Sequence, residues 1–543
     1  FDILFRNPVS TNHSLSISGG TETMSYYGSI NAIINNGTAR GNDSKTYSGS
    51  LRINSQLNKK LTVGLGLNVS QSETNGFYTV DPYSYATSTS RAIPCFDEEG
   101  ENYFYNKTTN GYKYNILNEI SQTGNTNTSK TFGLNADVRW TIVEGLRFET
   151  LFGLNASSTF GESYAGEESY YISQIRGYEF GSYRPSDQPY KMSPLPHGGE
   201  YNSTENRNLN YTWRNSLSYD QIFADRHRVS LVLGQEARSN KYDGLSQTSY
   251  GYFHNRGKSF TNPPLIIHTN TMGETGRNDL YDRCQQILTD RKSNYLAFYF
   301  TGSYAFDERY IVTGSIRSDA SNRFGQDTRN RFLPVWSIGG RWNVHNEPWM
   351  KSQRVVSDLN FRASYGWQGN VAENYGPDLI AYIGTGNDLI DYQSGDFMLK
   401  IKSLPYGDLR WEKTKTINLG MDVGFFSNRL NASVEYYQKK TKDMIVEKQV
   451  PYAYGVASMP INGGDMLNRG VEVQLGATLI RTNTFSWALS VNTSKNFNRV
   501  ESKMNENKNW RAAVSGSLNK AGYPVSSVWA FEFLGLDQTD GHP

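Results

Sequence analysis

The chain has 543 residues, and 54 Lys and Arg against 52 Asp and Glu leave it a formal net charge of +2. A chain so balanced in charge carries no strong field, which argues against a nucleic-acid partner. No stretch approaches the roughly 18 to 20 consecutive apolar residues that a membrane-spanning helix requires. A helical membrane protein is therefore excluded, whereas a β-barrel is not, because only alternate residues of its strands face lipid.

Strict two-residue alternation predicts long β-strands along the chain. Residues 61–69 place Leu or Val at every odd position and Thr, Gly or Asn at every even one. Such a strand has one apolar and one polar face. The same criterion predicts about seventeen strands, near residues 12–18, 25–33, 45–57, 61–72, 131–142, 146–157, 208–222, 228–238, 293–305, 310–317, 332–342, 357–367, 411–425, 430–445, 467–480, 485–497 and 523–535.

The connections between these strands fall into two classes that alternate along the chain. Bacterial outer-membrane barrels have short periplasmic turns and long extracellular loops. The predicted fold class is therefore an all-β, transmembrane antiparallel β-barrel. One connection of the short class, at residues 344–355, is longer than the others, and we expect it to contain a helical turn. The short turns are predicted at residues 19–21, 58–60, 143–145, 224–226, 307–308, 427–428 and 481–483.

Two alternatives remain open at this point. A soluble all-β carbohydrate-binding or adhesin protein would place the same strands in sandwiches, with the apolar faces packed inward. A passive porin would keep the barrel but lack a plug and a lid. The direction of the apolar face distinguishes the sandwich from the barrel.

Five stretches, in order along the chain, resemble the SusC/RagA family of TonB-dependent outer-membrane transporters. They read NHSLSISGGT at residues 12–21 followed by SYY at 25–27; RSDASNRFG at 317–325 leading to FLP at 332–334; LRWEKT at 409–414 through NLGMD at 418–422 to YYQKKTKD at 436–443; NRGVE at 468–472; and GYP at 522–524 to GLD at 535–537.

This resemblance implies an outer-membrane barrel of about 22 strands that contains an N-terminal plug. It further implies coupling to the TonB protein, a SusD-type surface lipoprotein as a lid, and import of oligosaccharides, or else of peptides. On this view residues 1–543 form a partial barrel domain. The plug, the TonB-contacting segment and one strand would precede it, and roughly four strands would follow it. The odd number of predicted strands independently suggests an incomplete barrel.

Charged and amide residues occupy the polar parity of the predicted strands. We expect them to face the lumen, where they contact the plug or water, or else a polar solute. Arg317, Asp319 and Arg323 lie where a strand is expected to pass into a loop. They form either a ligand site or a structural polar cluster. The residues predicted to face the lumen or contact the plug are Asn135, Asp137, Arg139, Arg147, Glu149, Asn360, Arg362, Asn418, Asp422, Glu435, Glu472 and Gln474.

The long loops supply the other candidate ligand residues. Aromatic faces stack on sugar rings or peptide side chains, and function tends to reside in loops. The same rings can instead pack on one another or on a lid protein. The candidates share one segment, and they are Tyr164, Tyr170, Tyr171, Tyr178, Phe180 and Tyr183.

The sequence contains no motif for catalysis or metal binding. The seven His residues are scattered, and there is no paired-His motif, nucleophile elbow or phosphate-binding Gly loop. We therefore predict no enzymatic activity, no metal and no cofactor. Cys95 and Cys284 are the only cysteines, which excludes a disulfide framework and leaves pairing between them open.

Overall fold

The computed structural model describes residues 2–530 except 109–110, 285, 323–332, 351, 371–378, 384–389, 392, 407, 483, 503–509 and 517, together with residues 532, 533, 535 and 539. By its contacts the chain divides into two compact units. Unit 1 comprises residues 1–139, 150–213 and 238–292, and unit 2 comprises residues 140–149, 214–237 and 293–543.

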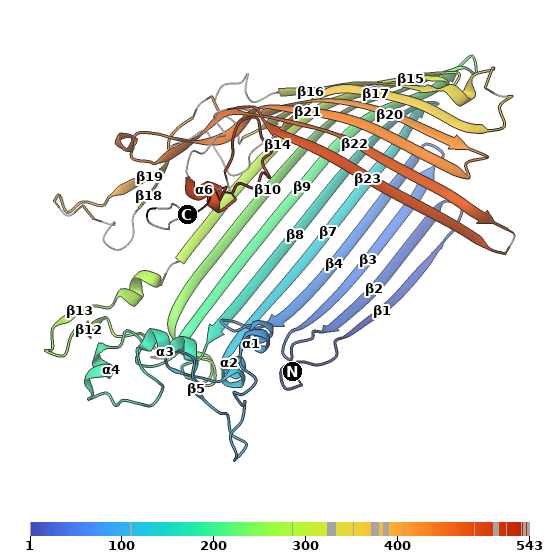
Figure 1. The fold of residues 1–543 in the computed structure, drawn as a ribbon. Helices are drawn as coiled ribbons and strands as arrows, with labels where there is room; N and C mark the ends of the chain where they lie inside the picture. The colour runs from blue at the N-terminus through green and yellow to red at the C-terminus, as the bar shows by residue number, and fades with distance from the viewer. Residues whose placement is uncertain are drawn as a thin grey trace. The chain divides into compact units, whose positions relative to one another are not determined.

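Long antiparallel hairpins dominate the described residues (Figure 1). Seventeen of the described strands belong to one sheet, which includes the very short β11. The strands of this sheet are β1 (Val9–Gly20), β2 (Met24–Asn36), β3 (Asp43–Asn58), β4 (Leu61–Gly76), β7 (Thr123–Val143), β8 (Leu146–Ala165), β9 (Gly199–Phe223), β10 (His227–Phe253), β11 (Ser259–Phe260), β14 (Gln286–Phe306), β15 (Tyr310–Ser321), β16 (Leu333–Asn343), β17 (Val356–Asn370), β20 (Glu412–Phe425), β21 (Leu430–Gln449), β22 (Ser458–Arg481) and β23 (Ser486–Val500).

The connections carry short strand pairs and short helices. The strand pairs are β5 (Tyr105–Asn106) with β6 (Lys113–Tyr114), β12 (Ile266–His268) with β13 (Thr275–Arg277), and β18 (Ile380–Ile383) with β19 (Leu399–Ser403). The helices are α1 (Pro82–Ser88), α2 (Ile116–Gln122), α3 (Tyr170–Arg176), α4 (Gln188–Met192), η1 (Asp279–Arg283), η2 (Val344–Asn346), η4 (Tyr452–Tyr454) and α6 (Trp510–Val514).

The first sixteen predicted strands are confirmed, and the short turns fall within a few residues of the predicted positions. The first turn lies at residues 21–23 rather than 19–21, and residue 483 of the last lies outside the described residues. Residues 344–355 contain the expected helical turn, η2. The seventeenth prediction, residues 523–535, is wrong, because none of its described residues is in a strand. Instead the Tyr523 and Trp529 rings pack locally, 4.9 Å apart.

The apolar face of the sheet is exposed. Leu15 is 68% exposed, Leu233 57% and Leu489 52%. In a soluble sandwich such side chains would pack against a second sheet. Their exposure favours the membrane barrel over the sandwich. Among the described residues no helix is long and apolar enough to cross a membrane.

The buried apolar clusters of unit 1 lie mainly in its loops. One cluster joins Ala165, Ile172, Leu195, Tyr250 and Leu280, and another contains Leu4, Tyr114 and Ile116. In Figure 1, α1 to α4 gather at the ends of β7, β8 and β9 that lie away from the short turns. We call this structure, built from the connections at residues 77–122, 166–198 and 254–284, the loop assembly.

Candidate functional site

The loop assembly rests on strands longer than a membrane requires. A transmembrane strand needs about 9–11 residues, whereas β8 has 20, β9 has 25 and β10 has 27. Their outer ends therefore extend beyond the lipid. The loop assembly is held on this extension, where a solute outside the cell would meet it first.

Asn115 fixes three loop segments to one another and is only 2% exposed. Its side-chain oxygen accepts hydrogen bonds from the backbone N–H groups of Leu117 and Asn118, capping α2. Its amide nitrogen donates to the carbonyl oxygens of Cys95, at 2.9 Å, and Tyr103, at 2.8 Å. One short polar side chain thus satisfies backbone groups from separate stretches of the same connection.

Glu200 is a buried carboxylate, 3% exposed, that accepts hydrogen bonds from several neutral groups. Tyr78 donates to it, as do the Tyr171 hydroxyl at 3.2 Å and the Asn202 amide at 2.8 Å. Burial raises the pKa of Tyr78 and Tyr171, and the neighbouring Glu200 raises both further. Both hydroxyls therefore remain protonated donors at neutral pH.

Arg176 is a buried cation, 1% exposed, at the end of α3. Its Nη2 donates to the Glu167 carbonyl at 2.7 Å, while Nε and Nη1 have no hydrogen-bond partner in the described part of the chain. Its guanidinium lies 5.8 Å from the Tyr178 ring centre and 5.4 Å from that of Phe180. Burial lowers the pKa of Arg176, and nearby Tyr178 and Glu167 oppose that shift.

The predicted loop aromatics pack mostly within the assembly. Tyr164 stacks on His254 at 5.0 Å, Tyr170 meets Tyr114 at 5.3 Å, and Tyr171 meets Tyr78 at 6.1 Å. The six rings thus do not form one common stacking platform.

The structure does bring three of these rings together beside Arg176. Tyr178 is buried and meets Tyr183 edge to face at 5.2 Å. Phe180 is 46% exposed and Tyr183 43% exposed. These last two rings are therefore the ones of the six that offer the most surface to a ligand.

Arg317 and Asp319 lie near the end of β15, which continues to Ser321. Arg317 pairs with Asp319 at 2.8 Å and with Glu236 at 3.2 Å, and it lies over the Tyr299 ring at 5.7 Å. This is an internally satisfied polar cluster. Arg323 lies outside the described residues.

Charged residues of the polar parity pair across the strands. Arg362 forms ion pairs with Asp422, at 2.9 Å, and with Glu435. A Cβ on Gly420 would collide with the Arg362 side chain, so a larger residue there would require Arg362 to shift. Glu472 lies opposite Glu435 in the β21–β22 register.

A second polar group lies in unit 1. Asp137 pairs with Arg139 at 3.0 Å, and a Cβ on Gly64 would lie 2.3 Å from the Asp137 carboxylate. Asn135 and Asp137 both line a cavity of about 330 Å³. In unit 2, Arg147 and Glu149 are at alternate positions of β8, and the Ser218 hydroxyl donates to the Arg147 carbonyl at 3.3 Å.

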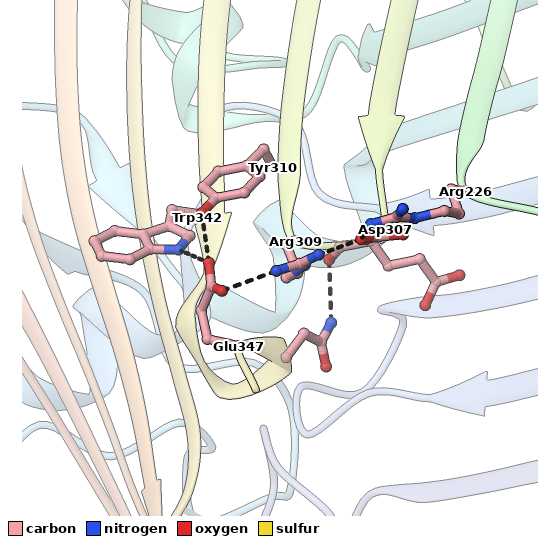
Figure 2. A network of polar contacts seen from close by, with 8 residues as sticks. Arg226, Asp307, Arg309, Tyr310, Trp342 and Glu347 are labelled. Carbon is pink, nitrogen blue, oxygen red and sulfur yellow. Dashed lines mark hydrogen bonds and ion pairs between the residues drawn. The ribbon is translucent and has the colours of Figure 1, made fainter. Parts of the chain in front are cut away.

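Sequence reasoning missed a network of ions that joins three of the short connections (Figure 2). Arg226 donates to Asp307 at 2.7 and 2.6 Å, and Arg309 bridges Asp307 to Glu347. Hydrogen bonds from Arg226 and Arg309 lower the pKa of Asp307. The Tyr310 hydroxyl donates to Glu347 at 2.6 Å. The sequence did contain a signal for this network. Charged residues recur in these short connections, although a tight turn requires only small turn-forming residues.

Cys95 and Cys284 are free thiols that belong to separate apolar clusters. Burial raises the pKa of the Cys284 thiol, which keeps it protonated. Within the described residues, no group of three His, Cys, Asp or Glu side chains is placed to hold a metal ion.

Long antiparallel strands, an exposed apolar face and alternating short and long connections define the class as a bacterial outer-membrane β-barrel. The family described as "TonB dependent receptor-like, beta-barrel" matches residues 100–531, and the chain belongs to this family. The predicted resemblance, the barrel fold and the outer-membrane location are thereby confirmed.

Named relatives agree with this assignment. The chain is 26% identical over 509 residues to TonB-dependent receptor P26 of Formosa agariphila, covering 92% of this chain and 46% of that protein. It is 26% identical over 520 residues to TonB-dependent receptor SusC of Bacteroides thetaiotaomicron, covering 92% and 48%. The chain thus spans about half the length of the curated relatives it matches.

Among solved structures, the RagAB peptide importer in its closed-closed state is similar in fold. The TM-score is 0.78 at 24% identity, and the match covers 100% of this chain and 57% of that one. At this identity the similarity shows the fold alone.

Proposed function

We propose that this barrel domain serves the active import of a nutrient across the outer membrane. Its family is one of transporters rather than of enzymes. The observation that carries the proposal is the loop assembly, a folded structure with its own apolar clusters and buried ionic groups on strands that extend beyond the lipid. A passive pore has no need of such an assembly, whereas a receptor needs a shaped, ordered mouth.

The proposed cargo is an oligosaccharide, with a peptide as the second candidate. A relative bears the name SusC, and a solved structure of similar fold is that of the RagAB peptide importer. The exposed rings of Phe180 and Tyr183, beside the cationic Arg176, are the proposed contact surface. Aromatic faces suit both cargo classes, because they stack on sugar rings and on peptide side chains alike.

The proposed partners are a SusD-like lipoprotein, which covers the loop assembly as a lid, and TonB, which supplies energy. The resemblance to the SusC/RagA family supports the lid, and the relatives P26 and SusC are both named TonB-dependent receptors. Both partners are proposed for this chain by analogy with those proteins.

Purification of the full-length protein from outer membranes, followed by mass spectrometry of everything that co-purifies, tests the proposal. A lipoprotein partner together with a bound oligosaccharide or peptide is the expected result. A protein that co-purifies with neither, and whose deletion leaves growth on every oligosaccharide and peptide source unchanged, would contradict it.

Paired variants test the proposed contact surface. Phe180→Ala combined with Tyr183→Ala is expected to reduce cargo binding at least tenfold, measured by calorimetry with the co-purified cargo. Tyr103→Ala is the matched control, because Tyr103 is similarly exposed, at 40%, in a different connection of the same assembly. Equal affinity of the double variant and the Tyr103→Ala control for the cargo would show that these two rings do not belong to the binding site.

A further inference from the structure

The polar face of β1 to β4 contains almost no charge. The strand register aligns its residues in rungs that run across these four strands. In the four rungs nearest the long connections, every residue except Ile33 is Ser, Thr or Asn. We call these four rungs the polar wall. They are Ser10, Asn35, Ser44 and Thr74; Asn12, Ile33, Thr46 and Ser72; Ser14, Asn31, Ser48 and Ser70; and Ser16, Ser29, Ser50 and Asn68.

The polar wall lines the interior of the barrel. The opposite face of the same strands contains the exposed apolar residues such as Leu15, and in an outer-membrane barrel that face is in contact with lipid. Side chains of the wall bond to one another across the strands, Ser29 to Ser50 at 2.7 Å and Thr46 to Ser72 at 2.9 Å. The wall therefore presents an ordered array of hydroxyl and amide groups without net charge.

The composition of the wall distinguishes between possible occupants. A protein segment packed against it would bury almost no apolar side chain of the wall and would find no charged group to pair with, although protein interfaces depend on both. A charged peptide would likewise meet no opposite charge. A sugar differs from both, because its hydroxyl groups exchange hydrogen bonds with Ser, Thr and Asn side chains and with water. The wall therefore favours an uncharged, hydroxyl-rich solute.

A pocket lies at the end of the wall toward the short turns. It is the cavity of about 330 Å³ that Asn135 and Asp137 line, and its volume is within the range of small-molecule sites, roughly 300–1,000 Å³. The rung next to the wall supplies Tyr27 and Arg52, and the position beside Arg52 is Gly66, which leaves the space open. Tyr27 is 45% exposed, and it is the only aromatic residue on the polar face of β1 to β4, whose residues are all described.

The pocket combines an aromatic face with groups that donate and accept hydrogen bonds. The Asn68 and Asn135 amides do both. Arg52 is the only charged residue on the polar face of the fully described strands β1 to β4, and Asp137 adds the opposite charge from β7, where it pairs with Arg139 at 3.0 Å. Such a pocket suits a sugar ring, which stacks by one face on the aromatic ring and forms hydrogen bonds through the hydroxyl groups at its edge.

We propose that the polar wall is a path for an uncharged oligosaccharide through the barrel, and that the pocket is a binding subsite for one of its sugar rings. Tyr27 stacks on the ring, while Asn68, Asn135 and Arg52 bond to its hydroxyl groups. Each hydrogen bond to the wall contributes little, so the oligosaccharide moves along the wall instead of remaining at one position. This inference rests on the proposed import function, and it selects the oligosaccharide over the peptide as cargo.

Adjacent tyrosines on opposite faces of β2 provide matched variants. Tyr27→Ala removes the proposed stacking face, Tyr27→Phe keeps it, and Tyr26→Ala removes a ring of similar exposure, 38%, from the lipid face. Cells that lack the full-length protein are grown on neutral gluco-, manno-, xylo- and fructo-oligosaccharides, on oligogalacturonides and on tryptic casein peptides. Each variant is then restored, and uptake of the oligosaccharide that the deletion strain no longer uses is measured. Tyr27→Ala is expected to lower the initial rate roughly tenfold, and the other two variants to keep the wild-type rate.

The outcomes separate the subsite from the import function. A deletion strain that still grows on every source contradicts import, and this proposal with it. Loss of growth only on the peptides or the oligogalacturonides overturns the path for an uncharged oligosaccharide but leaves import intact. Equal uptake by Tyr27→Ala and Tyr26→Ala overturns the subsite alone. Heat-modifiable migration on gels checks folding, and should Tyr27→Ala not fold, Gly66→Leu fills the same pocket from a position where a Cβ would come no closer than 3.8 Å to another atom.

Thiol labelling shows whether the pocket is open to a solute. Tyr27→Cys is treated with a small maleimide in growing cells, and the label is located by peptide mass spectrometry after purification. Labelling is expected, and it is expected to decrease when the transported oligosaccharide is added. Labelling that is absent, because another part of the protein fills the pocket, or that the oligosaccharide leaves unchanged, would overturn the subsite.

Discussion

Glu200 links α3 to the ends of β4 and β9, and Glu200→Gln tests how strongly it holds the loop assembly. The substitution keeps the shape of the side chain but removes the charge that strengthens its hydrogen bonds to Tyr78, Tyr171 and Asn202. A hydrogen bond to a charged group contributes about 1 kcal/mol more than a neutral one. Of the three donors only Tyr171 belongs to α3, so the expected loss in the free energy of opening of α3 is about 1 kcal/mol.

Hydrogen exchange of the α3 amides, followed by mass spectrometry, measures this opening directly. A loss of about 1 kcal/mol corresponds to exchange about fivefold faster. Glu205→Gln is the matched control on the same strand, because Glu205 pairs only with Arg207 at the surface, where ion pairs contribute little. Unchanged α3 exchange in Glu200→Gln, or equal acceleration in both variants, would refute the view that this buried carboxylate anchors α3.

Three further predictions concern other parts of the structure. Gly420→Ala places a methyl group 2.4 Å from Arg362 Nε and is expected to destabilise the barrel by about 1–3 kcal/mol in urea titrations, whereas Gly476→Ala has open space and is expected to be neutral. Burial raises the pKa of Glu119, so α2 is expected to gain protection from exchange as the pH falls through that raised pKa, and Glu119→Gln to abolish that dependence. Ile172→Ala, at a fully buried position, is expected to cost about 2–5 kcal/mol of local stability and to expose α3 to limited proteolysis.

The sign of the Glu119 prediction follows from proton linkage. A carboxyl group with a raised pKa binds its proton more tightly in the folded state than in the unfolded state. Its contribution to stability is therefore fully present at low pH and is lost as the pH rises through the folded pKa. Protection that instead increases with pH, after correction for the intrinsic exchange rate, would contradict the prediction. Equal urea midpoints for Gly420→Ala and Gly476→Ala would likewise reject the steric argument.

Alternation alone predicted the sixteen long strands, because a strand with one face in lipid and one in water must alternate along its whole length. It failed at residues 523–535 for a physical reason. A strand also requires that its backbone groups pair with those of a neighbour, and alternation does not say whether a segment makes that pairing. Among the described residues there, Trp529 instead donates its indole N–H to the Leu518 carbonyl.

The candidate site could be predicted only in part from the sequence. Composition located the aromatic-rich segment that contains α3, but not the partners that give each ring its role. Tyr78 and Glu200 meet across 122 positions of sequence, and Arg226 and Asp307 across 81. No local periodicity encodes such distant pairs, because they depend on which strands become neighbours.

The loop assembly and the sheet are stabilised by different means, and this has a consequence for specificity. The sheet depends on backbone pairing and on lipid at its apolar face. The assembly depends on caps and buried charges. Asn115 and Arg176 bond within their own connections, whereas Glu200 accepts hydrogen bonds from Tyr78 and Tyr171, which belong to two different connections. Residues in one hydrogen-bond network do not act additively. Under the proposed function, a change of cargo therefore requires coordinated substitutions in several loops, while the strands beneath them remain unchanged.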